Sequence, residues 1–250
     1  MTQVSAQWWD GYFDDEYLVE HAPMFGEGRD RPEVARAIEV LGLPVGAKVL
    51  DCPCGQGRHA RLLAEAGYAV TGVDHSPRLL EHAAGLPTSA RFVRGDMRRL
   101  PARWSGRFDG IVSLGASFGF FATRAEDAAV LAGYARCLRP EGRFILHAAN
   151  RDGIMARFIE KDWWESPDGV LVLHERRFDP VSGLLDVHVQ LRRGAKVARR
   201  AYRLRLYSPS ELAALAAQQG LLVTEVFDGY RDHPVRRHSG EMLLVGQRAA

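Results

Sequence analysis

Apolar segments of strand length alternate with helical patterns along the middle of the chain. These segments lie at residues 48–51, 68–74, 91–95, 108–114 and 143–149. Strands that alternate with helices are typical of a parallel sheet with helices on both faces. Two more such segments, residues 221–227 and 242–247, close the chain. The pattern therefore predicts a Rossmann-like α/β fold with a seven-stranded, mostly parallel sheet.

Local signals mark several helix ends. The helix after the first strand should end at Gly67, because glycine readily adopts the left-handed conformation that follows a helix. Ser76 and Pro77 suit the N-cap and the first turn of the next helix. Ser208 and Glu211 have the spacing of a capping box and predict that a late helix begins there.

The segments that flank this core follow other patterns. Residues 4–42 look mainly helical and are rich in aromatic side chains, which predicts a lid. Residues 170–207 contain three stretches in which apolar and polar side chains alternate, typical of an antiparallel meander with one apolar and one polar face. We expect one domain over residues 1–250. Its parts would be a helical lid (1–45), a core (46–150), an antiparallel β insertion after strand 5 (151–207), and a closing helix with strands (208–250).

The composition is that of an ordinary globular protein, with 46% hydrophobic and 26% charged residues. No apolar run approaches the ~20 residues of a membrane helix, and the first residues do not resemble a signal peptide. We therefore expect a cytoplasmic protein with no membrane partner. Cys52, Cys54 and Cys137 do not have the spaced pairs of a structural zinc site, so no metal is expected.

Arginines cluster at residues 192–205, in the meander. Alternation places His174 with Arg176, and Arg203 with Arg205, on its polar side. Three interpretations stay open for this surface: a solvated face, a substrate cap or subunit contact of a homodimer, and an RNA-binding face. Because the net charge is only +2, no nucleic-acid partner is expected.

The turn after the first strand carries the most informative chemistry. Asp51 ends that strand, and Gly55 and Gly57 follow in a short loop before a helix. Glycines let a ligand lie against the backbone, and open parallel sheets bind ligands beyond the carboxyl ends of their strands. Asp74 ends the second strand, about 20 residues later, where an acid can accept hydrogen bonds from ribose hydroxyls. These features suit either a dinucleotide or S-adenosylmethionine (SAM).

Asp96 and Met97, at the end of the third strand, separate these two ligands. An aspartate can accept a hydrogen bond from the adenine amino group, and a methionine can pack on the ring face. With these motifs the chain resembles the class I SAM-dependent methyltransferases, most closely a bacterial small-molecule group with an aromatic-rich leading helix. The resemblance is strong over residues 47–150 and implies SAM as cofactor and S-adenosylhomocysteine as product.

The resemblance also implies roles for individual residues. Residues 51–57 would hold the methionine part of SAM, and Leu114 would lie near the transferred methyl group. Pro53 replaces the glycine that is usual in this loop; proline keeps its carbonyl, so we expect adjusted rather than lost binding. His75 either lies over the adenine or caps the next helix. The cofactor-binding candidates are Tyr17, Asp51, Pro53, Gly55, Gly57, Asp74, His75, Asp96, Met97 and Leu114.

The loop after the fourth strand limits which classes of methyl acceptor are expected. It lacks the Asn/Asp-Pro-Pro-aromatic quartet for planar exocyclic amines, and the histidine that aminosugar N-methyltransferases tend to place there. We expect methylation of a small molecule on N or O, with no general base singled out. Acceptor-pocket candidates are Tyr12, Ser117, Phe118, Asn150, Arg151 and Trp164. Alternatives are an RNA- or protein-directed methyltransferase, a nicotinamide-dependent oxidoreductase and a non-catalytic SAM-binding module.

Overall fold

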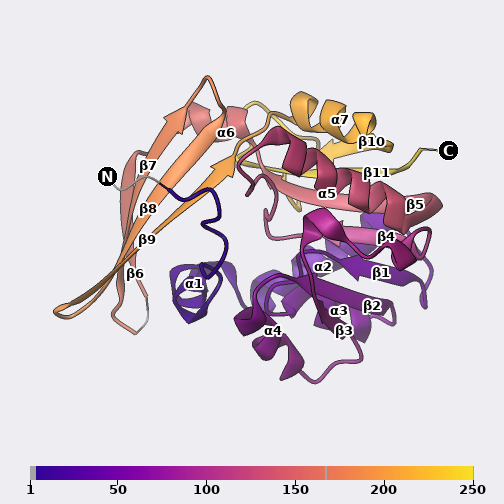
Figure 1. Ribbon diagram of the computed structural model, residues 1–250, viewed down its shortest axis with the longest axis horizontal. Coiled ribbons are helices and arrows are strands. Elements are labelled where there is room, and N and C mark those ends of the chain that lie inside the picture. The colour runs from indigo at the N-terminus through magenta and orange to yellow at the C-terminus, as the bar shows by residue number, and fades with distance from the viewer. Residues whose placement is uncertain (1–3, 167, 250) are drawn as a thin grey trace.

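Two β-sheets form the framework of the protein in the computed structural model (Figure 1). The structure describes residues 4–166 and 168–249. The larger sheet has seven strands in the order β10-β11-β5-β4-β1-β2-β3, and the smaller has four in the order β6-β7-β8-β9. The strands of the larger sheet are β1 (Lys48–Asp51), β2 (Ala69–Asp74), β3 (Arg91–Arg94), β4 (Phe108–Ser113), β5 (Leu138–Ala149), β10 (Leu221–Phe227) and β11 (Glu241–Arg248).

Strand pairing in the larger sheet confirms the predicted Rossmann-like fold. β1 lies parallel between β2 and β4, and β11 runs antiparallel to both its neighbours, β5 and β10. All seven predicted strands are present. β5 begins earlier than predicted, at Leu138 rather than at residue 143, because its first residues pair with β4 across an irregularity in the register.

Helices cover both faces of this sheet. They are α2 (Glu27–Leu41), α3 (Arg58–Glu65), α4 (Pro77–Ala84), α5 (Arg124–Cys137) and α7 (Pro209–Gln218). The local signals are confirmed: Gly67 has φ +92° after α3, Ser76 accepts a hydrogen bond from Leu79 N–H, and Ser208 and Glu211 form a capping box. Among the described residues, no helix has both the length and the apolar character needed to cross a membrane.

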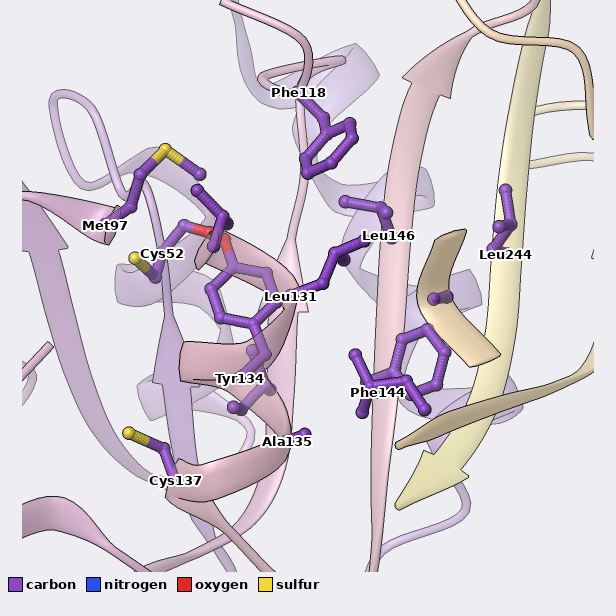
Figure 2. Packing of buried hydrophobic residues seen from close by; sticks show 14 of the residues in the cluster. Cys52, Met97, Phe118, Leu131, Tyr134, Ala135, Cys137, Phe144, Leu146 and Leu244 are labelled. Carbon is purple, nitrogen blue, oxygen red and sulfur yellow. Dashed lines mark hydrogen bonds between the residues drawn. The ribbon is translucent and has the colours of Figure 1, made fainter. Parts of the chain in front are cut away.

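The hydrophobic core divides along the larger sheet. On one face, side chains of α5 and α7 pack with β4, β5 and β11; Figure 2 shows Tyr134 and Leu131 of α5 beside Leu146 of β5. On the other face, α2 and α3 pack against the same strands. Burial on both faces fixes the sheet, so the carboxyl ends of its parallel strands form one edge with a defined geometry.

The smaller sheet is the predicted meander plus one strand that the sequence did not indicate. Its strands are β6 (Lys161–Glu165), β7 (Leu171–Asp179), β8 (Leu184–Arg193) and β9 (Lys196–Arg205), and a short helix, α6 (Arg151–Ala156), precedes it. The division into one apolar and one polar face is wrong for β7. His174 shares the inner face with Val172 and approaches the buried carboxylate of Glu20, with Nε2 3.7 Å from Oε1.

The N-terminal segment lies between the smaller sheet and the core (Figure 1). It is less helical than predicted: residues 4–14 form turns, followed by α1 (Asp15–Glu20) and η1 (Ala22–Met24). Trp8 and Tyr12 are buried against Tyr202 of β9. Aromatic packing, rather than helical periodicity, therefore holds this segment over the carboxyl edge of the larger sheet.

Candidate functional site

The loop between β1 and α3 forms the floor of the candidate site. Gly55 and Gly57 have left-handed φ values of +54° and +79°. A Cβ atom on Gly57 would lie 2.8 Å from the ring of Phe92 and 2.9 Å from Ala83. Glycine therefore allows α3 to begin close against β3 and α4, with the loop backbone open toward the sheet edge.

Asp51 is a buried carboxylate without a partner. It is 1% exposed, and neither carboxylate oxygen has a hydrogen-bond partner among the described residues. Burial raises the pKa of Asp51 to about 8, although nearby Arg58 opposes the shift. An unpaired buried charge is costly, whereas the α-ammonium group of SAM would supply both a counter-charge and hydrogen-bond donors. Asp51 thus fits the methionine end of SAM.

Asp74 lies at the end of β2 and holds the loop in place. Its Oδ2 accepts a hydrogen bond from Gly55 N–H at 2.8 Å, and its Oδ1 accepts one from Ser76 N–H at 2.9 Å. Burial raises the pKa of Asp74. A carboxylate oxygen has two lone pairs, so each oxygen can still accept from a ribose hydroxyl. Asp74 can therefore bind a ribose and organise the glycine loop at once.

An apolar hollow, also lined by Val73 and Leu79, lies beside Asp74. Seven of the predicted cofactor-binding residues line it: Tyr17, Pro53, Gly55, Asp74, His75, Asp96 and Met97. The peptide bond before Pro53 is cis. The hollow combines apolar walls with carboxylate acceptors, which matches the chemistry of an adenosine group.

Asp96 is more constrained than a free acceptor would be. Burial works to raise its pKa, but hydrogen bonds from Arg98 outweigh burial and hold the pKa below the ordinary value. Arg98 Nη2 donates to Asp96 Oδ2 at 2.6 Å, and Arg98 N–H donates to Oδ1 at 2.9 Å. Asp96 is therefore a fixed carboxylate at the rim of the hollow.

Four aromatic residues that sequence reasoning did not assign to the site also line this hollow: Trp9, Phe13, Phe120 and Phe121. The Trp9 ring lies 4.9 Å from the His75 ring, edge to face, and 4.8 Å from the Arg98 guanidinium. Trp9 comes from the N-terminal segment, so only its fold over the sheet edge brings it here. The aromatic richness of residues 8–25 was the available signal, but it did not indicate which rings face the ligand.

A second, more polar hollow adjoins the first. Both hollows are lined by Tyr17, Pro53, Gly55 and Ser117, so one ligand can extend from one into the other. The second hollow is also lined by Leu114, the residue expected near the transferred methyl group, together with His147 and Glu241. Glu241 was not anticipated, because β11 is far from the glycine loop in sequence.

Charged groups in the polar hollow form a compact network. Arg58 donates to Asp30 and to Glu33, and Arg29 Nε donates to Glu33 at 2.8 Å. Asp30, Glu33 and His59 have metal-ligand atoms within 4.8 Å of one another. The guanidinium groups of Arg58 and Arg29 together balance the charges of Asp30 and Glu33, so this cluster is an ion-pair network.

The structure places the other candidates outside both hollows. Asp51 is buried before the loop, Gly57 faces Phe92 and Ala83, and Tyr12 donates to buried Glu20. Phe118 is in the core beside Tyr207. The remaining three serve the chain after β5: Asn150 caps α6 and donates to Ser239, Arg151 pairs with Glu211, and Trp164 packs in the smaller sheet. Each side chain is already engaged by neighbours that fold back from distant parts of the chain.

Comparisons with known proteins find similarity to methyltransferases. Residues 49–142 match the family described as a methyltransferase domain, and residues 12–85 match the tellurite resistance protein TehB family. A glycine/sarcosine N-methyltransferase of Halorhodospira halochloris is 35% identical over 133 residues, 52% of this chain and 50% of the relative. A dTDP-3-amino-3,4,6-trideoxy-alpha-D-glucopyranose N,N-dimethyltransferase of Streptomyces venezuelae is 31% identical over 50% of this chain and 56% of that protein.

Solved structures extend the similarity to nearly the whole fold. The CcbJ methyltransferase of Streptomyces caelestis has a TM-score of 0.80 at 21% identity, with 93% of this chain and 96% of that chain covered. SAM-bound CalS10, an amino pentose methyltransferase, has a TM-score of 0.70 at 21% identity, with 95% and 98% covered.

The sheet order defines a Rossmann-like α/β fold. Residues 49–142 match a methyltransferase domain, and the chain shares the fold of solved SAM-dependent methyltransferases. The chain spans about half the length of the curated relatives it matches. Its own activity, acceptor and partners are therefore matters for proposal.

Proposed function

We propose that this protein transfers the methyl group of SAM to a nitrogen or oxygen of a small molecule. The observation that carries the proposal is the buried, unpartnered carboxylate of Asp51, which directly precedes the loop whose Pro53 and Gly55 line both hollows. The apolar hollow suits adenosine, and Asp51 suits the α-ammonium group. This arrangement directs the sulfonium methyl toward the polar hollow.

Methyl transfer from SAM needs little chemical assistance from the side chains of the protein. The positive charge on sulfur already activates the methyl group, so the protein mainly aligns the acceptor in line with the carbon–sulfur bond. The N-terminal segment and the smaller sheet, which pack on each other above the sheet edge, would exclude water and limit the acceptor to small molecules. The names of the relatives, which include amino-acid and sugar N-methyltransferases, support this acceptor class.

Calorimetric titration with SAM, S-adenosylhomocysteine and NAD tests the cofactor assignment. We expect binding of the first two and much weaker binding of NAD; binding of NAD alone would contradict the proposal. Transfer is tested with SAM labelled on its methyl group and separate small-molecule, RNA and protein fractions as acceptors. Label should enter the small-molecule fraction, and incorporation into RNA or protein alone would favour the other acceptor classes.

A further inference from the structure

Glu241 and His147 meet at the polar hollow from neighbouring strands. Glu241 begins β11, and His147 lies near the end of β5, next to it in the sheet. His147 Nε2 lies 3.4 Å from Glu241 Oε2, and both residues line the hollow that also contains Leu114 and Ser117. The Glu241 side chain is 37% exposed, whereas that of His147 is 3% exposed. Glu241 is thus the accessible partner of a buried histidine.

The backbone fixes which nitrogen of His147 carries the proton. Ala116 N–H donates to His147 Nδ1 at 3.0 Å, so in the neutral ring the proton is on Nε2, which is directed toward Glu241. The ring of Tyr230 packs against the other side, with centroids 4.6 Å apart. Nε2 has no well-aligned hydrogen-bond partner among the described residues. His147 therefore orients Glu241 through Nε2. The other ring nitrogen of His147, Nδ1, already accepts the hydrogen bond from Ala116.

Glu241 differs from the other acidic residues near the polar hollow in its charged neighbours. Arg29 and Arg58 are matched by Glu33 and Asp30 through direct ion pairs. Among the described residues, no arginine or lysine lies within ion-pair distance of Glu241, and contact with His147 holds the pKa of Glu241 below its ordinary value although burial opposes the shift. The hollow therefore presents one ionised carboxylate that has no arginine partner.

We propose that Glu241 binds the amino group of the methyl acceptor, that His147 positions Glu241, and that the acceptor is a small amine. This inference rests on the proposed methyltransferase function and specifies its substrate class. A cationic group gains both a hydrogen bond and an ion pair with ionised Glu241, while a hydroxyl gains the hydrogen bond without the attraction of opposite charges. A carboxylate or phosphate at the same position would be repelled.

The same placement favours the transfer step. An acceptor ammonium first loses a proton to water, and the nitrogen lone pair then forms a bond to the methyl carbon. The carbon–sulfur bond breaks, and its electron pair stays on sulfur, which becomes a neutral thioether. Positive charge thus moves from sulfur to nitrogen, and a fixed carboxylate beside the nitrogen stabilises that charge as it develops.

The test measures discrimination between an amine and an alcohol of matched shape. n-Propylammonium chloride and n-propanol are titrated into the protein, with and without S-adenosylhomocysteine, and the amide signals of Ala116 and Gly229 are followed by NMR. A Cβ on Gly229 would lie 3.3 Å from Glu241 Oε2, so this amide reports on the carboxylate. We expect propylammonium to bind at least about tenfold more tightly than propanol. This ratio corresponds to a difference of about 1.4 kcal/mol in binding free energy.

Glu241→Gln should remove this preference, while Glu225→Gln, a matched change on the exposed part of β10, should leave it intact. Equal binding of the two probes, or a preference that survives in Glu241→Gln, would overturn the inference. For the positioning role, ¹³C NMR should show a higher Glu241 pKa in His147→Ala. An unchanged pKa there would overturn that role. Failure of S-adenosylhomocysteine to bind would instead contradict the proposed function, and it is read separately by calorimetry.

Discussion

The hydroxyl of Tyr134 donates a hydrogen bond to the backbone carbonyl of Cys52, and both residues are fully buried. This bond joins α5, on one face of the sheet, to the first residue of the glycine loop, and Figure 2 shows the two side chains side by side. The hydrogen bond from α5 therefore holds the glycine loop in place, although no residue of α5 lines either hollow.

Tyr134→Phe should destabilise the protein by about 1–3 kcal/mol, because the change leaves a buried carbonyl without its donor. The free energy of unfolding is measured by urea denaturation. Tyr68→Phe is the matched control: Tyr68 donates to the Leu43 carbonyl at a site that is only partly buried, where water can replace the phenol. A loss no larger than that of the control would show that the Tyr134 bond adds little.

Asp74→Ala should weaken SAM binding by about 1.5–3 kcal/mol, the usual range for removing a partner of this kind. The variant loses the acceptor proposed for the ribose, and it also frees the Gly55 and Ser76 amides that Asp74 holds. Calorimetry gives the affinity, and a melting curve of the ligand-free variant separates loop destabilisation from lost ligand contacts. An affinity equal to that of the wild type would mean that Asp74 does not bind the ribose.

Asp127 should make the protein less stable as pH rises from about 4 to about 6. Burial raises the Asp127 pKa to about 6, although a hydrogen bond from Tyr207 opposes the shift. The native state therefore keeps a proton that the unfolded chain loses near its ordinary pKa of about 3.9. The contribution of Asp127 to stability is present below that value and is lost as pH rises through the folded pKa.

Asp127→Asn removes this titration and keeps an acceptor for the Tyr207 hydroxyl. Relative to the wild type, the variant should gain about 1–3 kcal/mol of stability between about pH 4 and pH 6, by comparison of urea midpoints across this range. A difference between the two proteins that does not change with pH would refute the shifted pKa.

The polar and glycine residues at the ends of β1 and β2 could be predicted from the sequence, because their positions depend only on neighbouring residues in the chain. Asp51, Gly55 and Asp74 follow directly from where two strands end, and the sheet order places those ends together. The acceptor side was less predictable because its residues arrive from distant segments. Trp9 depends on the packing of the N-terminal segment, and Glu241 depends on β11 pairing beside β5.

Two misplaced candidates show the physical limit of such reasoning. Asn150 and Arg151 follow β5 and so were expected at the ligand edge. They are instead used to begin α6 and to pair with Glu211 at the start of α7. A position at the end of a strand places a residue near the ligand edge of the sheet. Where its polar side chain points depends on which hydrogen-bond and ion-pair partners are available. Here those partners lie far away in the sequence.

SAM should bind more tightly as pH rises from about 6 to about 8. Without ligand, burial holds the pKa of Asp51 near 8, so the carboxyl group is mostly protonated at neutral pH. An ammonium group favours the ionised form, so binding must release that proton, and affinity should increase by up to about tenfold per pH unit below the pKa. Calorimetry in buffers of different ionisation enthalpy counts the proton released. Asp51→Asn cannot titrate and should show weaker binding without this pH dependence. A wild-type affinity that is constant over the range, with no proton released, would show that Asp51 does not contact the ammonium group.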